Sequence, residues 1–256
     1  MRLSTIKSNG FIDRASSNLQ SLYISGVYIN AHSSLRLNIL AGKEKTYQAW
    51  NGIPEARLKG DIQGMKDFFK QNGYDAADSA HLFNSANRTY NYFTYNNQTD
   101  NYQQNQYQLF LNHQWNSHTS FNVATFFTRG LGYYEEYKKA QAFSSYGLPN
   151  YIMGTDTIKT TNLIRQLWLD NYFYGNVFSL QYNKDEDMLT IGGGWSKYDG
   201  KHYGKIIWAD INIPHDYNWY NYTAHKTDYN IYVKYQRAIN QYWSLFGDVQ
   251  YRNVQY

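Results

Sequence analysis

Two groups of aromatic side chains have the clearest potential for ligand chemistry in this chain. Both fall in segments that interrupt the strand pattern described below: Trp50, Tyr92 and Tyr95 in the first, and Trp208, Tyr217, Trp219 and Tyr220 in the second. Flat rings of this kind stack on a sugar, a corrin or an aromatic chelating group. The alternative is that the same rings pack the loops and contribute to an aromatic belt. The sequence therefore predicts a ligand-binding role for these seven residues, with loop packing as the rival interpretation.

Other chemistries have weaker signals. The side chains that could chelate a metal are His202, His215, Asp199, Asp210 and Asp216. Their spacing matches no defined metal site. The acidic run 185–187 lacks the spaced ligands and glycine of a calcium loop, and no Lys-Ser or Lys-Thr follows the glycines at 192–194, as a phosphate loop would require. We expect no catalytic residue, no metal, no cofactor and no enzyme activity.

The elements that would position the aromatic groups alternate apolar and polar residues. Leu35, Leu37 and Ile39 alternate with Arg36 and Asn38, the period of a strand with one apolar and one polar face. The expected strands are residues 17–30, 34–48, 102–115, 119–130, 166–182, 188–198, 226–238 and 242–256, with 1–8 as a candidate ninth. Short turns separate some strands and long loops, at 49–101, 131–165 and 199–225, separate the others. We expect one antiparallel meander, because short turns join antiparallel neighbours.

The longest of these loops carries its own helix signals. Asp61 is placed to cap a helix that runs to about Gln71, with Gly73 as its stop, and a further helical turn is expected near Asp75–Phe83.

The two faces of the expected sheet have different partners. The apolar set comprises Leu35, Leu37, Ile39, Tyr229, Ile231 and Val233, and the polar set comprises Arg36, Asn38, Lys234, Arg129 and Arg165. In a membrane-spanning barrel the apolar face meets lipid and the polar face lines the lumen. We expect each set to share one face.

Composition agrees with a barrel. Aromatic residues make up 19% of the 256 residues, including 28 Tyr, yet the mean hydropathy is −0.72 and 17% of residues are charged. Tyr suits the boundary between water and hydrocarbon. No apolar run approaches the ~18 residues that a spanning helix needs, whereas a spanning strand needs about 9 to 11. The net charge of +4 and the lack of a basic run do not indicate nucleic acid. The chain has no Cys, so no disulfide framework is expected.

Several segments resemble the TonB-dependent outer-membrane receptors of Bacteroidetes-type bacteria. They are Thr46–Glu55, Asp100–Asn105, Phe127–Glu135, Leu163–Asn171, Gly192–Trp195 with Tyr198–Gly200, and Asp248–Arg252. The resemblance implies active transport of a scarce solute (siderophore-iron, haem, cobalamin or an oligosaccharide) in the outer membrane of a Gram-negative bacterium. It also implies TonB, outer-membrane lipid and a small-molecule ligand as partners, with a surface lipoprotein as a candidate.

The family combines a TonB box, a plug and a barrel of 22 strands. The start of this chain has no signal peptide pattern, and no plug is recognised. We therefore expect residues 1–256 to be one part of such a barrel domain, an open meander with Leu3, Ile6, Val249 and Tyr251 near its free edges. Two other interpretations stay open: a soluble extracellular β-sandwich or open sheet that binds glycans with its aromatic faces, and a passive porin.

Overall fold

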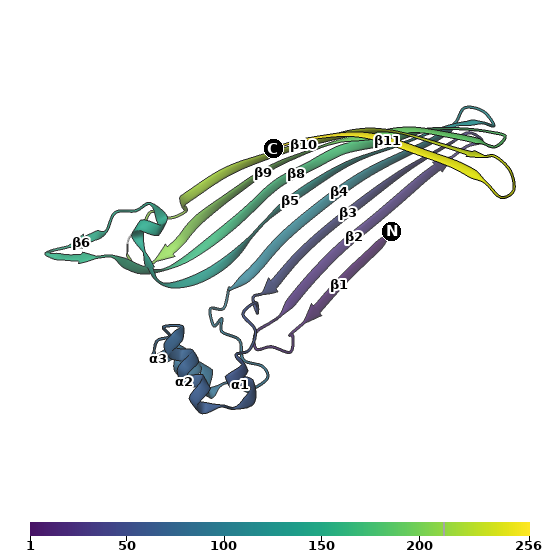
Figure 1. The fold of residues 1–256 in the computed structure, drawn as a ribbon. Coiled ribbons are helices and arrows are strands. Elements are labelled where there is room, and N and C mark those ends of the chain that lie inside the picture. Colours follow the sequence, from purple (N-terminus) through teal and green to yellow (C-terminus); the bar gives the residue numbers. More distant parts are fainter. Residues whose placement is uncertain (212) are drawn as a thin grey trace.

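The computed structural model describes residues 1–211 and 213–256, and its main feature is a single curved sheet of nine antiparallel strands (Figure 1). The strands, in both chain and spatial order, are β1 (Arg2–Ser8), β2 (Ser17–Ile29), β3 (Ser33–Tyr47), β4 (Thr99–Gln114), β5 (Thr119–Ala142), β8 (Thr160–Lys184), β9 (Asp187–Ala209), β10 (Tyr217–Ala238) and β11 (Ser244–Gln255). β1 and β11 are the two edges of this open sheet. The expected meander and its open edges are confirmed.

The connections differ between the two ends of the sheet. Segments 30–32, 115–118, 185–186 and 239–243 form the turn rim, and segments 9–16, 48–98, 143–159 and 210–216 form the loop rim. Three of the turns use an asparagine in the same way: the Oδ1 atoms of Asn30, Asn116 and Asn240 accept the backbone N–H three residues later, at 2.7, 2.9 and 3.0 Å. Asparagine side chains close tight turns by this bond. The expected contrast between the rims is therefore present.

Two of the loops are much shorter than the sequence pattern indicates. Residues 131–165 and 199–225 were expected to be loops, but β5, β8, β9 and β10 run through most of both segments and leave only 143–159 and 210–216 as connections. The apolar–polar alternation ends there because Lys201 and Lys205 occupy positions that apolar residues hold lower on β9. The backbone ladder continues without that alternation. At about 3.3 Å per residue the 25 residues of β8 reach about 80 Å, well beyond a bilayer.

The register places the expected apolar residues on one face. Leu35 lies opposite Leu111, and the row continues through Val123, Phe178 and Gly193 to Ile231. Directly opposed residues of neighbouring strands share a face. We call this side the apolar face and the opposite side, with Arg36 and Lys234, the polar face.

Large side chains on the apolar face are exposed, with 40% of Leu35 and 51% of Ile231 accessible. Soluble proteins rarely expose an apolar surface of this extent. The separation of the two sets is confirmed except at Arg129, which pairs in register with Asn105 and Tyr172 and so lies on the apolar side. That expectation was wrong because the alternation was read only locally, without the register.

Buried side chains form two small cores near the loop rim, one within segment 48–98 and one of Tyr146 with Leu163 and Ile206 from the adjoining strand ends. The segment 48–98 contains α1 (Glu55–Lys59), α2 (Ile62–Gln71) and α3 (Ala76–Asn84), which enclose Met65, Leu82 and Tyr90. Asp61 and Asp75 cap α2 and α3 by accepting the backbone N–H three residues on, at 2.9 and 2.8 Å, which confirms both expected helices.

The other loop-rim structure follows β5. A 3-10 turn (Phe143–Tyr146) leads to a small hairpin of β6 (Tyr151–Met153) and β7 (Asp156–Ile158), which projects from the sheet in Figure 1. Among the described residues, no helix has the length and apolar character needed to cross a bilayer.

Candidate functional site

Close to the loop rim, the polar face carries a layer of aromatic rings. We call this layer the aromatic wall; its members are Tyr102, Tyr134, Tyr198, Trp219, Tyr220 and Tyr222. The register gives four of them a common face, because Tyr134 aligns through Leu167 and Gly204 with Tyr220, and Tyr102 aligns through Gly132, Leu169 and His202 with Tyr222. Tyr198 lies an even number of residues from Gly204 on β9, and Trp219, at a bulge in β10, joins them through its contact with the Tyr220 ring.

Glycines provide the space for these rings. A Cβ on Gly204 would lie 2.4 Å from the Trp219 ring, and a Cβ on Gly132 would lie 2.6 Å from Cδ2 of Tyr102. Both distances are too short for a Cβ, and at Gly132 the Cβ would also lie 2.2 Å from the backbone oxygen of Asn101. The rings therefore lie flat against the sheet, as aromatic side chains do over strand glycines.

Arg165 lies beside Trp219 at one end of the aromatic wall. Arg165 donates to Oε2 of Glu136 through Nε at 3.2 Å and Nη2 at 2.9 Å, and through Nη1 to the hydroxyl of Tyr146 at 3.1 Å. Its guanidinium carbon is 5.8 Å from the centre of the Trp219 ring, and the Tyr217 hydroxyl donates to the backbone oxygen of Tyr146 at 3.1 Å. Because Glu136 neutralises the charge of Arg165, the aromatic wall presents rings and hydroxyl groups with little net charge.

The second expected aromatic group is only partly brought together. Tyr217, Trp219 and Tyr220 lie on the polar face, with Trp219 and Tyr220 in edge contact at 5.0 Å. Trp208 does not join them. A bulge between Ile206 and Trp208 pairs Trp208 with Ile164, while Ile206 pairs with Arg165. Neighbouring strand residues point to opposite faces, so Trp208 lies away from the wall, a consequence that sequence spacing does not reveal.

The first expected group divides as well. Trp50 is 58% exposed and contacts the Tyr134 ring edge-on at 5.5 Å, which extends the aromatic wall. Tyr92 packs on the loop core and stacks on Tyr74 at 5.3 Å. The Tyr95 hydroxyl donates to Glu135 at 2.8 Å. Tyr92 and Tyr95 instead line a groove of about 240 Å³ between segment 48–98 and the end of β5.

A buried carboxylate attaches segment 48–98 to the sheet. Glu135 is 3% exposed, and besides Tyr95 it accepts from Asn97 Nδ2 at 2.6 Å and Gln166 Nε2 at 2.7 Å. The side-chain amide of Gln48 also donates to the Glu135 backbone oxygen at 3.2 Å, and Gln98 Oε1 accepts the backbone N–H of Tyr137 at 2.9 Å. These amides satisfy the edge of β5 where pairing with β4 ends.

A second attachment is ionic and joins the end of β5 to α3. Lys139 Nζ is 2.8 Å from Asp75 and 2.7 Å from Asp78, at the start of α3. The hydrogen bond from Lys139 holds the pKa of the Asp75 carboxyl below its usual range. In the same loop, burial raises the pKa of the Tyr74 hydroxyl to about 12.

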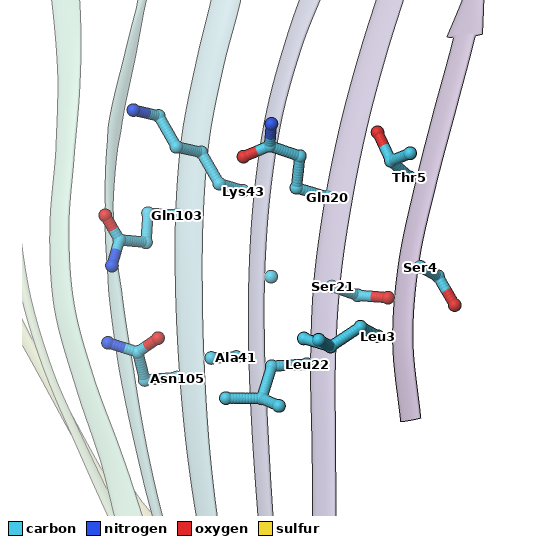
Figure 2. Close-up of a pocket in the computed structure, with 11 residues that line it drawn as sticks. Leu3, Ser4, Thr5, Gln20, Ser21, Leu22, Ala41, Lys43, Gln103 and Asn105 are labelled. Atoms are coloured by element: carbon cyan, nitrogen blue, oxygen red, sulfur yellow. The ribbon is translucent and has the colours of Figure 1, made fainter. Parts of the chain in front are cut away.

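A larger groove of about 450 Å³ lies on the apolar side of β1–β4 (Figure 2). Lys43, Gln20 and Gln103 line one end of it, and Leu3 and Leu22 line the other. The groove faces away from the aromatic wall, so it is not part of the candidate site. Among the described residues, no three His, Asp or Glu side chains converge as metal ligands would.

Sequence reasoning missed Tyr102, Tyr134 and Tyr198, because they belong to strand segments that were expected to be loops or ordinary strand. A signal for them exists in retrospect. Gly130, Gly132, Gly200 and Gly204 recur at even spacing on β5 and β9. Glycine repeated on one face of a strand marks a close approach by a neighbouring group.

No protein-family model and no curated protein sequence matches this chain. Solved structures do match. The open form of the ferric-catecholate import receptor Fiu from E. coli K12 aligns with 98% of this chain at a TM-score of 0.65 and 16% identity. The chain has the fold of part of that receptor.

The chain spans 39% of the length of the open-form receptor. The closed form of the same receptor aligns with 98% of the chain at a TM-score of 0.59 and 16% identity, over 36% of the receptor chain. The ferric preacinetobactin receptor BauA from Acinetobacter baumannii has a TM-score of 0.46 at 8% identity. The nine-stranded meander and the alignment with the open-form receptor at a TM-score of 0.65 confirm the fold class expected from the sequence, a barrel-type antiparallel meander. The described residues form one nine-stranded sheet and a two-stranded hairpin, which is not a β-sandwich, and the glycan-binding open sheet stays an alternative prediction.

Proposed function

We propose that this chain forms part of the barrel of a TonB-dependent outer-membrane receptor that imports a scarce solute. The observation that carries the proposal is the alignment of 98% of the chain with a ferric-catecholate import receptor at a TM-score of 0.65. The exposed apolar face and the polar opposite face support it, because a barrel in a bilayer needs both.

The remaining barrel strands and a plug would come from elsewhere in the receptor. Two strand edges are open in β1 and β11, and an open edge in hydrocarbon leaves backbone donors and acceptors unsatisfied at several kcal/mol each. Further strands paired to these edges remove that cost. A plug in the lumen, coupled to the inner membrane through TonB, would supply the energy that a membrane without ATP lacks.

The aromatic wall is the proposed ligand-contacting surface of this part of the receptor. Its position on the polar face at the loop rim is where a solute that enters a barrel first meets the interior. Trp219 and Tyr220, with Trp50 at the margin, offer flat rings and hydroxyls beside a charge-compensated Arg165. This chemistry suits a ligand that can stack on aromatic rings, as the planar ring of a catechol chelate and the C–H face of a sugar ring both can.

The test uses the intact receptor gene in its own host. Deletion of the gene should abolish uptake of one ligand among ferric catecholate, haem, cobalamin and a labelled oligosaccharide, and loss of TonB should abolish the same uptake. Uptake that persists without TonB would instead favour a passive porin, and normal uptake of every solute in the deletion strain would contradict the proposal.

A matched pair of variants tests the wall. Trp219→Ala should raise the KM of uptake about tenfold, since an aromatic contact contributes about 0.5–1.5 kcal/mol beyond area burial. Trp208→Ala removes the same side chain from the other face and should leave KM unchanged. Equal effects of the two substitutions would show that the wall does not contact the ligand.

A further inference from the structure

A second aromatic cluster lies on the apolar side of the sheet, above the exposed apolar residues. Trp168 and Tyr203 are opposed in register and stack at 5.7 Å with only 5° between their ring planes. Tyr133, opposite Trp168 on β5, adds a third ring at 4.5 Å from Trp168. Together with Lys201 and Lys205 we call these residues the outer platform.

The two lysines give the outer platform a positive charge. Lys205 Nζ lies 5.8 Å and 5.9 Å from the centres of the Trp168 and Tyr203 rings. Lys201 is exposed, and no carboxylate among the described residues forms an ion pair with it. Asp170 lies opposite Lys201 in register but binds Arg129 at 2.7 Å, and Asp199 binds Lys197 at 3.1 Å. Glu135, in the row of Lys205, is buried and accepts its hydrogen bonds from neutral groups.

The height of the outer platform on the sheet is defined by the register. Phe127 belongs to a row of rings on the apolar face, with Tyr107 at 6.2 Å and Tyr174 at 6.4 Å. Such a row marks the boundary of the hydrocarbon layer. Tyr133 lies six residues further along β5, about 20 Å along a strand that is tilted in a barrel. Lys201, in the row of Leu131, lies between these two levels.

We propose that the outer platform binds the phosphorylated sugar headgroup of a glycolipid in the outer leaflet of the membrane. Flat rings stack on a sugar face, and Lys201 and Lys205, neither of which forms an ion pair among the described residues, pair with its phosphates. The occupant is a lipid, and not a free sugar phosphate, because the outer platform continues into the exposed apolar face, where Leu131 and Phe127 are accessible to acyl chains at 38% and 40%. Lys43, at the polar end of the groove in Figure 2, lies in the same cross-strand row as Leu131 and Lys201. It therefore places a further positive charge along this side of the sheet.

This inference rests on the proposed location in an outer membrane, but its test does not require transport. The receptor purified in detergent is titrated with bisphosphorylated lipid A, with its dephosphorylated form and with glucosamine 1-phosphate, and binding is followed by native mass spectrometry. Lys201→Gln with Lys205→Gln should weaken binding of the phosphorylated lipid about 25-fold, about fivefold for each lysine. Lys226→Gln on the polar face is the control and should bind as the wild type does.

The outcomes are distinct. Preference for the phosphorylated lipid that disappears in the double lysine variant supports the proposal. Equal binding of the two lipid forms, undiminished binding by the double variant, or binding of glucosamine 1-phosphate as tight as that of the lipid overturns it. Solute uptake by the double lysine variant should remain normal. If lipid binding is not observed, the proposed import function is therefore unaffected, because import is tested separately by the loss of TonB.

Discussion

Replacement of Glu135 by Gln should release the helical segment 48–98 from the sheet while the sheet itself stays folded. The carboxylate accepts three hydrogen bonds, from Tyr95, Asn97 and Gln166 at 2.8, 2.6 and 2.7 Å. A glutamine keeps one acceptor oxygen and presents an NH₂ group where the other oxygen accepted a bond. Hydrogen bonds to a charged group contribute about 1.5–3 kcal/mol each, and a buried donor left unpaired adds a penalty.

We therefore expect the opening of segment 48–98 to become easier by about 2 kcal/mol, which corresponds to about 30-fold faster amide exchange. Hydrogen-exchange mass spectrometry of peptides from 49–98 in detergent measures this directly. Glu44→Gln is the control, because the described residues give the Glu44 side chain no hydrogen-bond partner, and it should exchange as the wild type does. Unchanged protection of 49–98 in the Glu135 variant would refute the role assigned to this carboxylate.

Four further predictions follow from the same structure. Lys139 lowers the pKa of the Asp75 carboxyl. The ion pair between Asp75 and Lys139 therefore stabilises the docked loop fully above the ordinary carboxyl pKa of about 4, and this stabilisation is lost as the pH falls through the lowered pKa. Amide exchange of α3 should rise over this pH range in the wild type but not in Asp75→Asn, which keeps the helix cap. Gly204→Ala should displace the Trp219 ring, because its Cβ would lie 2.4 Å from that ring, and should shift tryptophan emission and raise the KM of uptake. Ile231→Lys should lower stability in lipid by about 2–4 kcal/mol, measured by urea unfolding in vesicles. Residues 1–256 expressed alone should need detergent and show no uptake in vesicles, since β1 and β11 leave unpaired edges.

Matched positions act as controls for two of these changes. A Cβ on Gly247 meets nothing within 4 Å, so Gly247→Ala should change neither emission nor KM. Asn230→Lys places the same charge one residue away on the polar face, and its cost should be much smaller. If Asn230→Lys destabilises the protein as much as Ile231→Lys, the assignment of the two faces is wrong.

The sheet was predictable because its signal is local and repeated. Period-two alternation around Leu35 and around Ile231 identified the strands, and the short turns at 31–33 and 116–118 identified the meander. The upper halves of β5 and β9 were not predictable, because charged residues such as Glu135, Lys201 and Lys205 interrupt the apolar–polar alternation there. Backbone pairing between the strands continues in these segments, although their residue types alone do not indicate strands.

The candidate site was predictable only in part. Composition found Trp219 and Tyr220 by their crowding in one segment. It could not separate Trp208, whose face depends on a one-residue bulge, or find Tyr134, whose partner Trp50 is distant in sequence. Such relations depend on register between strands, which a pattern within one strand does not contain.

The most direct test of a membrane-spanning receptor sheet is the environment of consecutive residues in its native membrane. The chain has no Cys, so single cysteines at each position from 230 to 233 can carry a nitroxide label without a background. Electron paramagnetic resonance then measures collisions with oxygen, which concentrates in lipid, and with a water-soluble nickel chelate. We predict that oxygen accessibility is high at Ile231 and Val233 and low at Asn230 and Tyr232, with the nickel chelate showing the reverse. Equal nickel accessibility at all four positions would contradict a sheet with one face in lipid.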